Sequence, residues 1–148
     1  MSVVVGACFA VGAVVHAADY PAAYRHAAES GRPLLVLVGT EWCPGCVKMK
    51  HQVIPQAQVR GTMSKVEFAQ MDADDALAGQ IMRGNSIPQL VMFTKTEAGW
   101  KRSQITGAKS VAEVESFINS NMPSPSTAVS SISEPAPRLG SASATSAR

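Results

Sequence analysis

The stretch Glu41–Met49, EWCPGCVKM, holds two of the three cysteines of the 148-residue chain, and these two stand two residues apart. It follows Leu34–Val38, five consecutive aliphatic residues, a pattern typical of a short strand buried on both faces of a parallel sheet. Pro44 suits the first position of a helix, so a helix is expected to begin directly after the first cysteine of the pair. The sequence therefore predicts a buried strand, a CxxC pair and a helix in immediate succession.

A cysteine at the N-terminus of a helix has a definite chemical consequence. The sulfur of Cys43 would face unpaired backbone N–H groups and the positive end of the helix dipole, and both favour the thiolate. The thiolate is the form that attacks disulfides, and the cysteine pKa in such settings falls from about 8.5 to roughly 3.5–7.5. Cys46 would lie one turn further into the helix, deeper and more readily protonated. We therefore expect Cys43 to be the nucleophile and Cys46 the thiol that resolves the mixed disulfide.

The same pair allows other uses, which the sequence supports less well. A structural zinc site needs four ligands, and the sequence contains no second CxxC and no HxxxH pattern. A copper(I) site could use both thiolates with Met49 nearby, although Met49 also fits the apolar stripe of the helix. A purely structural disulfide would close a loop too small to constrain the unfolded chain much. We expect no bound metal and no cofactor, with copper(I) carriage kept as an alternative.

Hydrophobic periodicity and turn residues place further helices and strands on either side of this stretch. Pro55 is expected to end or kink the helix that begins at Pro44, and the aspartates at 72–75 to cap another. The element order predicts the α/β class, with a mixed four-stranded sheet flanked by helices on both faces. The expected helices are 19–30, 44–54, 56–64, 72–83 and 110–120, and the expected strands are 34–38, 66–71, 90–94 and 100–106.

The first residues differ from everything that follows. Val3–Val15 is an uninterrupted run of apolar and small residues, too short to span a membrane but typical of the apolar core of a secretory signal. No Lys or Arg precedes the run, so a buried first strand is the alternative. A cut between Ala17 and Ala18 would remove Cys8 and leave only the CxxC pair. We expect residues 1–17 to be a signal peptide and the protein to be exported, to a periplasmic or other extracytoplasmic compartment.

Composition limits what the rest of the chain does. Residues 18–121 suffice for one domain with a real core, whereas residues 122–148 are rich in Ser, Pro and Ala and predict a disordered tail. The net charge is only +2, and no basic run suggests nucleic-acid binding. We expect a monomer that has no stable membrane span once the signal peptide is removed.

The combination of these features resembles the thioredoxin-like superfamily over about Tyr20–Asn121. It consists of the buried strand, EWCPGC at 41–46 and, about forty residues later, Ile87-Pro88 at the start of a strand. The stretch 30–55, SGRPLLVLVGTEWCPGCVKMKHQVIP, is most similar to secreted and periplasmic members, including the C-terminal domains of the DsbD transmembrane electron shuttles. The resemblance implies a thioredoxin fold and thiol–disulfide exchange without a bound cofactor.

The resemblance also assigns roles to residues beside the cysteines. It implies that Pro88 follows a cis peptide bond and lies against the cysteine pair, and that a substrate pairs with the backbone of Ile87 by strand addition. Trp42 would border the site and pack beside the substrate. Pro44 and Gly45 stand between the cysteines, where the family tunes its redox potential, but in the opposite order to the Gly-Pro of ordinary thioredoxin.

Other positions depart from the family pattern. Thioredoxin carries a buried Asp that aids proton transfer to the resolving cysteine, and a Lys that pairs with it; here these positions align with Leu37 and Gln70. Glu41 is near but expected to be more exposed, so proton transfer would rely on water. Gln89 replaces the Thr that often follows the cis proline, and its side chain could contact a partner or simply be solvated.

These features together predict a protein-disulfide oxidoreductase of the thioredoxin-like kind. Its partners would be disulfide-containing protein substrates and an upstream thiol protein or membrane electron donor. Reduction is the expected direction, and a disulfide oxidase or isomerase is the first alternative. A non-enzymatic copper(I) carrier or a thioredoxin-fold adaptor is the second.

Overall fold

The structure is a computed structural model that describes residues 19–123. The expected signal peptide, residues 1–17, and all but the first two residues of the expected tail, 122–148, lie outside the described residues. These two segments and their boundaries therefore stay predictions. None of the helices between residues 19 and 123 has the length and apolar character needed to cross a bilayer.

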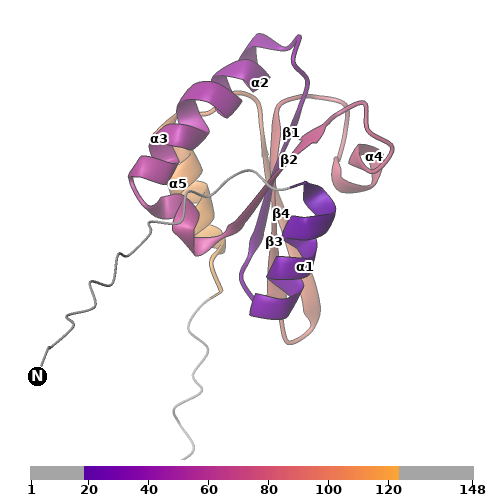
Figure 1. Ribbon diagram of the computed structural model, residues 1–148, viewed down its shortest axis with the longest axis vertical. Helices are drawn as coiled ribbons and strands as arrows, with labels where there is room; N and C mark the ends of the chain where they lie inside the picture. Colours follow the sequence, from indigo (N-terminus) through magenta and orange to yellow (C-terminus); the bar gives the residue numbers. More distant parts are fainter. Residues whose placement is uncertain (1–18, 124–148) are drawn as a thin grey trace, which may run out of the picture.

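The aliphatic run becomes β1 (Leu34–Gly39), an inner strand of a four-stranded sheet in the order β2-β1-β3-β4 (Figure 1). It runs parallel to β2 (Glu67–Asp72) and antiparallel to β3 (Gln89–Thr96). β4 (Gly99–Thr106) pairs with β3 as an antiparallel hairpin. The predicted mixed four-stranded sheet is thus confirmed, as is the burial of its aliphatic strand.

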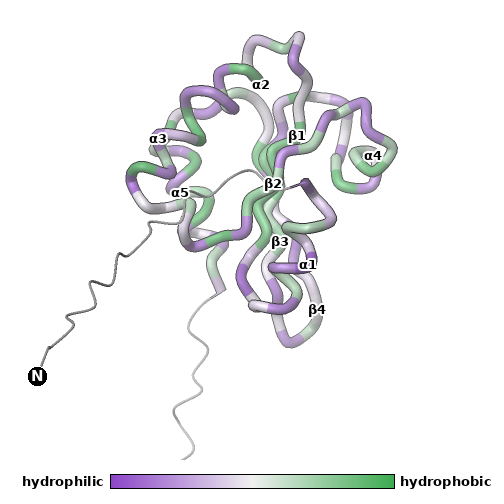
Figure 2. The backbone as a smooth tube through the Cα atoms, viewed as in Figure 1, coloured by the Kyte–Doolittle hydropathy of each residue, from purple (hydrophilic) through white to green (hydrophobic). Residues whose placement is uncertain are grey.

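Helices cover both faces of this sheet. The first face carries α2 (Pro44–Lys48), α3 (Ile54–Val59) and α5 (Val111–Asn121), and the second carries α1 (Tyr20–Ser30) and α4 (Ala78–Ile81). Alternate side chains of β1 enter the two cores, because successive residues of a strand point to opposite faces. In Figure 2, which colours the chain by residue hydropathy, hydrophobic residues gather along the strands at the centre of the molecule.

The helix that begins at Pro44 does not end at Pro55. It continues through a π-helical segment, η1 (Met49–Val53), into α3, and the Ile54 N–H donates to the carbonyl of Met49 five residues back. A proline lacks the N–H of the helical ladder, and its ring clashes with the carbonyl four residues back. The wider π turn directly before Pro55 relieves this conflict. Of the two outcomes expected at Pro55, an end or a kink, the end is therefore wrong.

Two other expected helices are shorter than predicted. The helix expected at 56–64 is interrupted at Gly61, whose φ of 80° is left-handed, and a 3₁₀ turn, η2 (Thr62–Lys65), follows. The helix expected at 72–83 is reduced to α4, because Asp72 ends β2 and its carboxylate accepts a hydrogen bond from the Asp74 N–H (2.9 Å). This local bond stabilises a turn at the position where the pattern predicts a helix cap.

Candidate active site

The structure places Cys43 at the N-cap of α2, as the sequence predicts. Its backbone is extended, Pro44 occupies the first turn of the helix, and its sulfur accepts a hydrogen bond from the backbone N–H of Cys46 (3.3 Å). The first N–H groups of a helix have no partner within the helix. Here the sulfur of Cys43 accepts a hydrogen bond from one of these N–H groups, so the atom that would react also caps the helix.

The two thiols differ in how firmly they hold their protons. The pKa of Cys43 is lowered, first by a hydrogen bond from the Cys46 side chain and then by backbone N–H groups of Cys46 and Gly45. The pKa of Cys46 is raised to about 11, first by burial and then by the hydrogen bond that its thiol donates to Cys43. Both cysteines are free thiols in this structure. The arrangement favours one thiolate, on Cys43, with its partner kept protonated.

Gly39 makes room for the buried thiol. A Cβ atom at this position would lie 2.7 Å from the Sγ of Cys46 and 2.8 Å from its Cβ, closer than real Cβ contacts allow. The last residue of β1 must therefore lack a side chain for the helix to sit on the strand end. Sequence reasoning missed this residue, although a glycine directly after five aliphatic residues was the available signal.

Pro88 lies against the cysteine loop from the other side. The Ile87–Pro88 peptide bond is cis. An added Cβ on Gly45 would lie 3.4 Å from both the Cδ of Pro88 and the Cβ of Ala108, so the loop and the proline are in near contact. Pro88 is buried and Ile87 is half-buried. The structure thus brings the CxxC loop and the Ile87-Pro88 pair together, as the resemblance implies.

Trp42 stands at the edge of this arrangement with most of its surface open to solvent. It is 73% exposed, and together with Ile87, Met82 and Asn85 it lines a hollow of about 390 Å³. A large indole left in water is unusual, because burying an aromatic side chain is favourable. The exposed indole of Trp42, the residue before Cys43, therefore forms part of the wall of this hollow.

The Gln89 side chain is neither exposed to solvent nor placed to contact a partner, the two alternatives considered from the sequence. Its side chain is fully buried and contacts the preceding loop. The amide nitrogen donates to the carbonyls of Arg83 (3.0 Å) and Ser86 (2.9 Å), and the amide oxygen accepts from the Arg83 N–H (3.3 Å). The side chain holds the loop that leads into Ile87.

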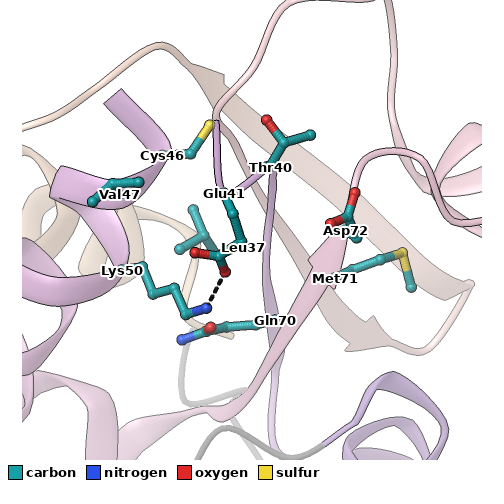
Figure 3. Close-up of a pocket in the computed structure, with 10 residues that line it drawn as sticks. Leu37, Thr40, Glu41, Cys46, Val47, Lys50, Gln70, Met71 and Asp72 are labelled. Atoms are coloured by element: carbon teal, nitrogen blue, oxygen red, sulfur yellow. Dashed lines mark hydrogen bonds and ion pairs between the residues drawn. The ribbon is translucent and has the colours of Figure 1, made fainter. Parts of the chain in front are cut away.

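Behind Cys46 lies a second, smaller hollow of about 160 Å³ (Figure 3). Leu37 of β1 and Gln70 of β2 are paired neighbours in the sheet, and both line this hollow. The positions that align with the buried Asp and its Lys partner in thioredoxin therefore carry no charged side chain here. Glu41, 68% exposed, forms an ion pair with Lys50 at this hollow. The exposure of Glu41 agrees with the prediction from sequence.

No cluster of three or more His, Cys, Asp or Glu side chains suited to a metal ion occurs within residues 19–123. Met49, the third ligand considered for copper(I), is 1% exposed, and its sulfur accepts a hydrogen bond from the Lys109 N–H (3.2 Å). Its side chain serves the core packed between the sheet and α5.

The comparisons with known proteins agree with this geometry. A family model described as thioredoxin-like matches residues 15–95, more than half of the chain. The chain belongs to the thioredoxin-like family. No curated protein matched it in sequence.

Solved structures of thioredoxins share the fold. A thioredoxin from Thermus thermophilus superposes with a TM-score of 0.58 at 21% identity, covering 69% of this chain and 82% of its own. A chloroplastic thioredoxin z superposes with a TM-score of 0.57 at 17% identity, and the match covers 72% of this chain and 92% of the thioredoxin z chain. The Trichomonas vaginalis thioredoxin superposes with a TM-score of 0.53 at 23% identity, and the match covers 71% of this chain and 93% of that thioredoxin. At these identities the likeness shows the fold alone. Family and cysteine pair together support thiol–disulfide oxidoreductase chemistry in general terms.

Replacing Gly39 by alanine tests the fit between β1 and Cys46. The new methyl group would collide with the Cys46 side chain, and overpacking of this kind costs about 1–3 kcal/mol. We expect Gly39→Ala to lower the free energy of unfolding by that amount in urea denaturation. Gly79→Ala is the matched control, since nothing lies within 4 Å of a Cβ there. Equal stability of the two variants would contradict the close contact.

The lowered pKa of Cys43 predicts which thiol is alkylated and at what pH. Because its pKa lies below the ordinary cysteine value, the Cys43 thiolate persists as the pH falls, whereas Cys46 with a pKa of about 11 is protonated at neutral pH. We expect iodoacetamide at pH 7 to modify Cys43 first, with peptide mass spectrometry as the readout. Faster modification of Cys46 would reverse the assignment.

Proposed function

We propose that this protein reduces disulfide bonds of other proteins, with Cys43 as the nucleophile and Cys46 as the resolving thiol. One observation carries the proposal. The hydrogen bond from the Cys46 thiol and the N–H groups at the N-terminus of α2 favour the thiolate on Cys43, while burial keeps the proton on Cys46. Such a pair supplies a nucleophile and a second thiol for the following step.

The reaction would proceed by two exchanges. The Cys43 thiolate attacks one sulfur of the substrate disulfide, a mixed disulfide forms, and the other substrate sulfur leaves as a thiolate that takes a proton from solvent. Cys46 then loses its proton and attacks the sulfur of Cys43. The second substrate sulfur leaves, and the protein is left with a Cys43–Cys46 disulfide. Two electrons have passed to the substrate, and no cofactor is required.

The surroundings of Cys43 support an extended protein segment as the substrate. The backbone at Ile87 lies beside the cysteine loop, where strand addition would align a substrate chain through main-chain hydrogen bonds. The exposed Trp42 and the hollow that it shares with Ile87 would then take a substrate side chain. Trp42, Ile87 and Pro88 are the substrate-binding residues of this proposal.

An exported location and an external electron source complete the proposal. Both rest on the sequence: the apolar run before Ala18 favours export, and a reductase must itself be reduced after each turnover. An upstream thiol protein or a membrane electron donor would supply the electrons. The same chemistry run in reverse would make the protein a disulfide oxidase.

Single cysteine replacements test the mechanism. We expect Cys43→Ser, in a full chain carrying Cys8→Ser, to lose insulin-disulfide reduction almost completely, because its nucleophile is gone. Cys46→Ser should accumulate a mixed disulfide between Cys43 and the substrate, visible on a non-reducing gel, because nothing resolves it. Reduction by Cys43→Ser at the wild-type rate would exclude this mechanism. A thioredoxin-fold adaptor would instead bind its partner with both cysteines replaced.

The reduction potential of the pair tests the direction. We expect equilibration with graded thiol–disulfide buffers, followed by thiol alkylation, to give a value near the thioredoxin figure of about −270 mV. A value near about −120 mV would identify an oxidant and contradict the reductase proposal. Pro44 and Gly45 are the redox-tuning positions, so their exchange to Gly-Pro should move the measured value while leaving both thiols in place.

A further inference from the structure

The hollow behind Cys46 contains a charged side chain that the proposed mechanism has not used. Lys50 is four residues after Cys46 on the same continuous helix, and residues at this spacing lie on one face of a helix. Both side chains line the hollow of about 160 Å³, together with Glu41 and Asp72 (Figure 3). Lys50 is the one cationic residue among those that line it within the described part of the chain.

In the structure Lys50 is engaged by Glu41, but this engagement is weak. The two side chains are 36% and 68% exposed, and exposed ion pairs contribute only about 0–1 kcal/mol. The ammonium group can therefore exchange Glu41 for another anion at little cost. A thiolate on Cys46, four residues away on the same helical face, would be such an anion.

The resolving step forms a thiolate on Cys46, in surroundings that otherwise disfavour a negative charge. Cys46 is 5% exposed, and its burial is the main cause that raises its pKa. The ionisable group in direct contact with it is Cys43, and the charged residues that line the hollow with it are Glu41, Asp72 and Lys50. During the resolving step Cys43 is bonded to the substrate and uncharged, so Glu41 and Asp72 are the groups that disfavour a new negative charge. The Thr40 N–H donates a hydrogen bond that favours the Cys46 thiolate. Lys50 is the group whose charge has the sign that the step needs.

We propose that Lys50 stabilises the Cys46 thiolate across this hollow during the resolving step, and that Glu41 restrains Lys50 by pairing with it between turnovers. The proposal rests on the exchange function described above. In the step, the Cys46 S–H bond breaks and its proton passes to solvent. The Cys46 sulfur then bonds to Cys43 as the Cys43–substrate bond breaks, and the substrate thiolate leaves. The lysine keeps its protons throughout and acts through its charge alone.

A neutral disulfide probe separates the two steps in one measurement. The full chain carrying Cys8→Ser reacts with dithiodipyridine, and each attack releases one equivalent of coloured thiopyridone. The first release reports the attack of Cys43 on the probe, and the second reports the attack of Cys46 on the mixed disulfide. Below the pKa of Cys46, the rate of the second release is proportional to its thiolate fraction.

We expect Lys50→Met to slow the second release about threefold or more between pH 7 and 8, with the first unchanged. This corresponds to a rise of about 0.5 unit in the Cys46 pKa, less than the 1–3 units of a directly contacting charge. Lys50→Arg should keep the wild-type rate. Glu41→Gln should accelerate the second release, because Lys50 is then unrestrained. Lys48→Met, on the same helix but exposed and outside the hollow, is the matched control and should change neither phase.

Salt gives a second measurement without any substitution. Because salt screens Lys50 as well as Glu41 and Asp72, added salt should slow the second release of the wild-type chain relative to that of Lys50→Met. An unchanged second release in Lys50→Met would overturn the proposal. A slower one in Glu41→Gln would also overturn it, since Glu41 would then act as the proton acceptor. A wild-type chain that gives only one release would contradict the proposed function itself, and this inference with it.

Discussion

The active site depends on the absence of a side chain at the end of β1. The strand is buried on both faces up to Val38, and Gly39 then leaves space that the Cys46 sulfur fills. With the second cysteine seated on the strand end, the N-terminus of α2 comes to the edge of the sheet. Cys43 thereby becomes the N-cap of the helix. This contact seats the Cys46 sulfur against the strand end and leaves the Cys43 sulfur at the helix N-terminus, so the two thiols have different surroundings.

Much of this arrangement was predictable from local patterns. Five aliphatic residues in succession indicated the buried strand, and a CxxC with proline directly after its first cysteine indicated a helix that begins at the cysteine pair. The mixed sheet followed from the order of the patterns along the chain. These features are local in sequence, so short-range physical rules suffice to predict them.

What sequence reasoning missed depends on contacts between distant segments or on competition between local bonds. The turn after β2 forms because the Asp72 carboxylate binds the Asp74 N–H, although the same aspartates are equally good helix caps. The helix continues past Pro55 because a π turn directly precedes the proline. Residues on both sides of this turn pack into the same core, which stabilises the continuous helix. Gln89 is polar yet wholly buried, because four backbone groups of the loop before it satisfy its amide. None of these outcomes is visible in hydrophobic periodicity.

The burial of Gln89 has a consequence for recognition. Its amide connects the start of β3 to the backbone of residues 83–86, so the segment that leads into Ile87 is held in place before any partner arrives. A binding edge that is already ordered loses less conformational entropy when a chain docks on it. Main-chain docking on such an edge needs few specific side-chain contacts to be favourable. For the strand addition proposed at Ile87, preorganisation by one buried amide would favour breadth of recognition over selectivity.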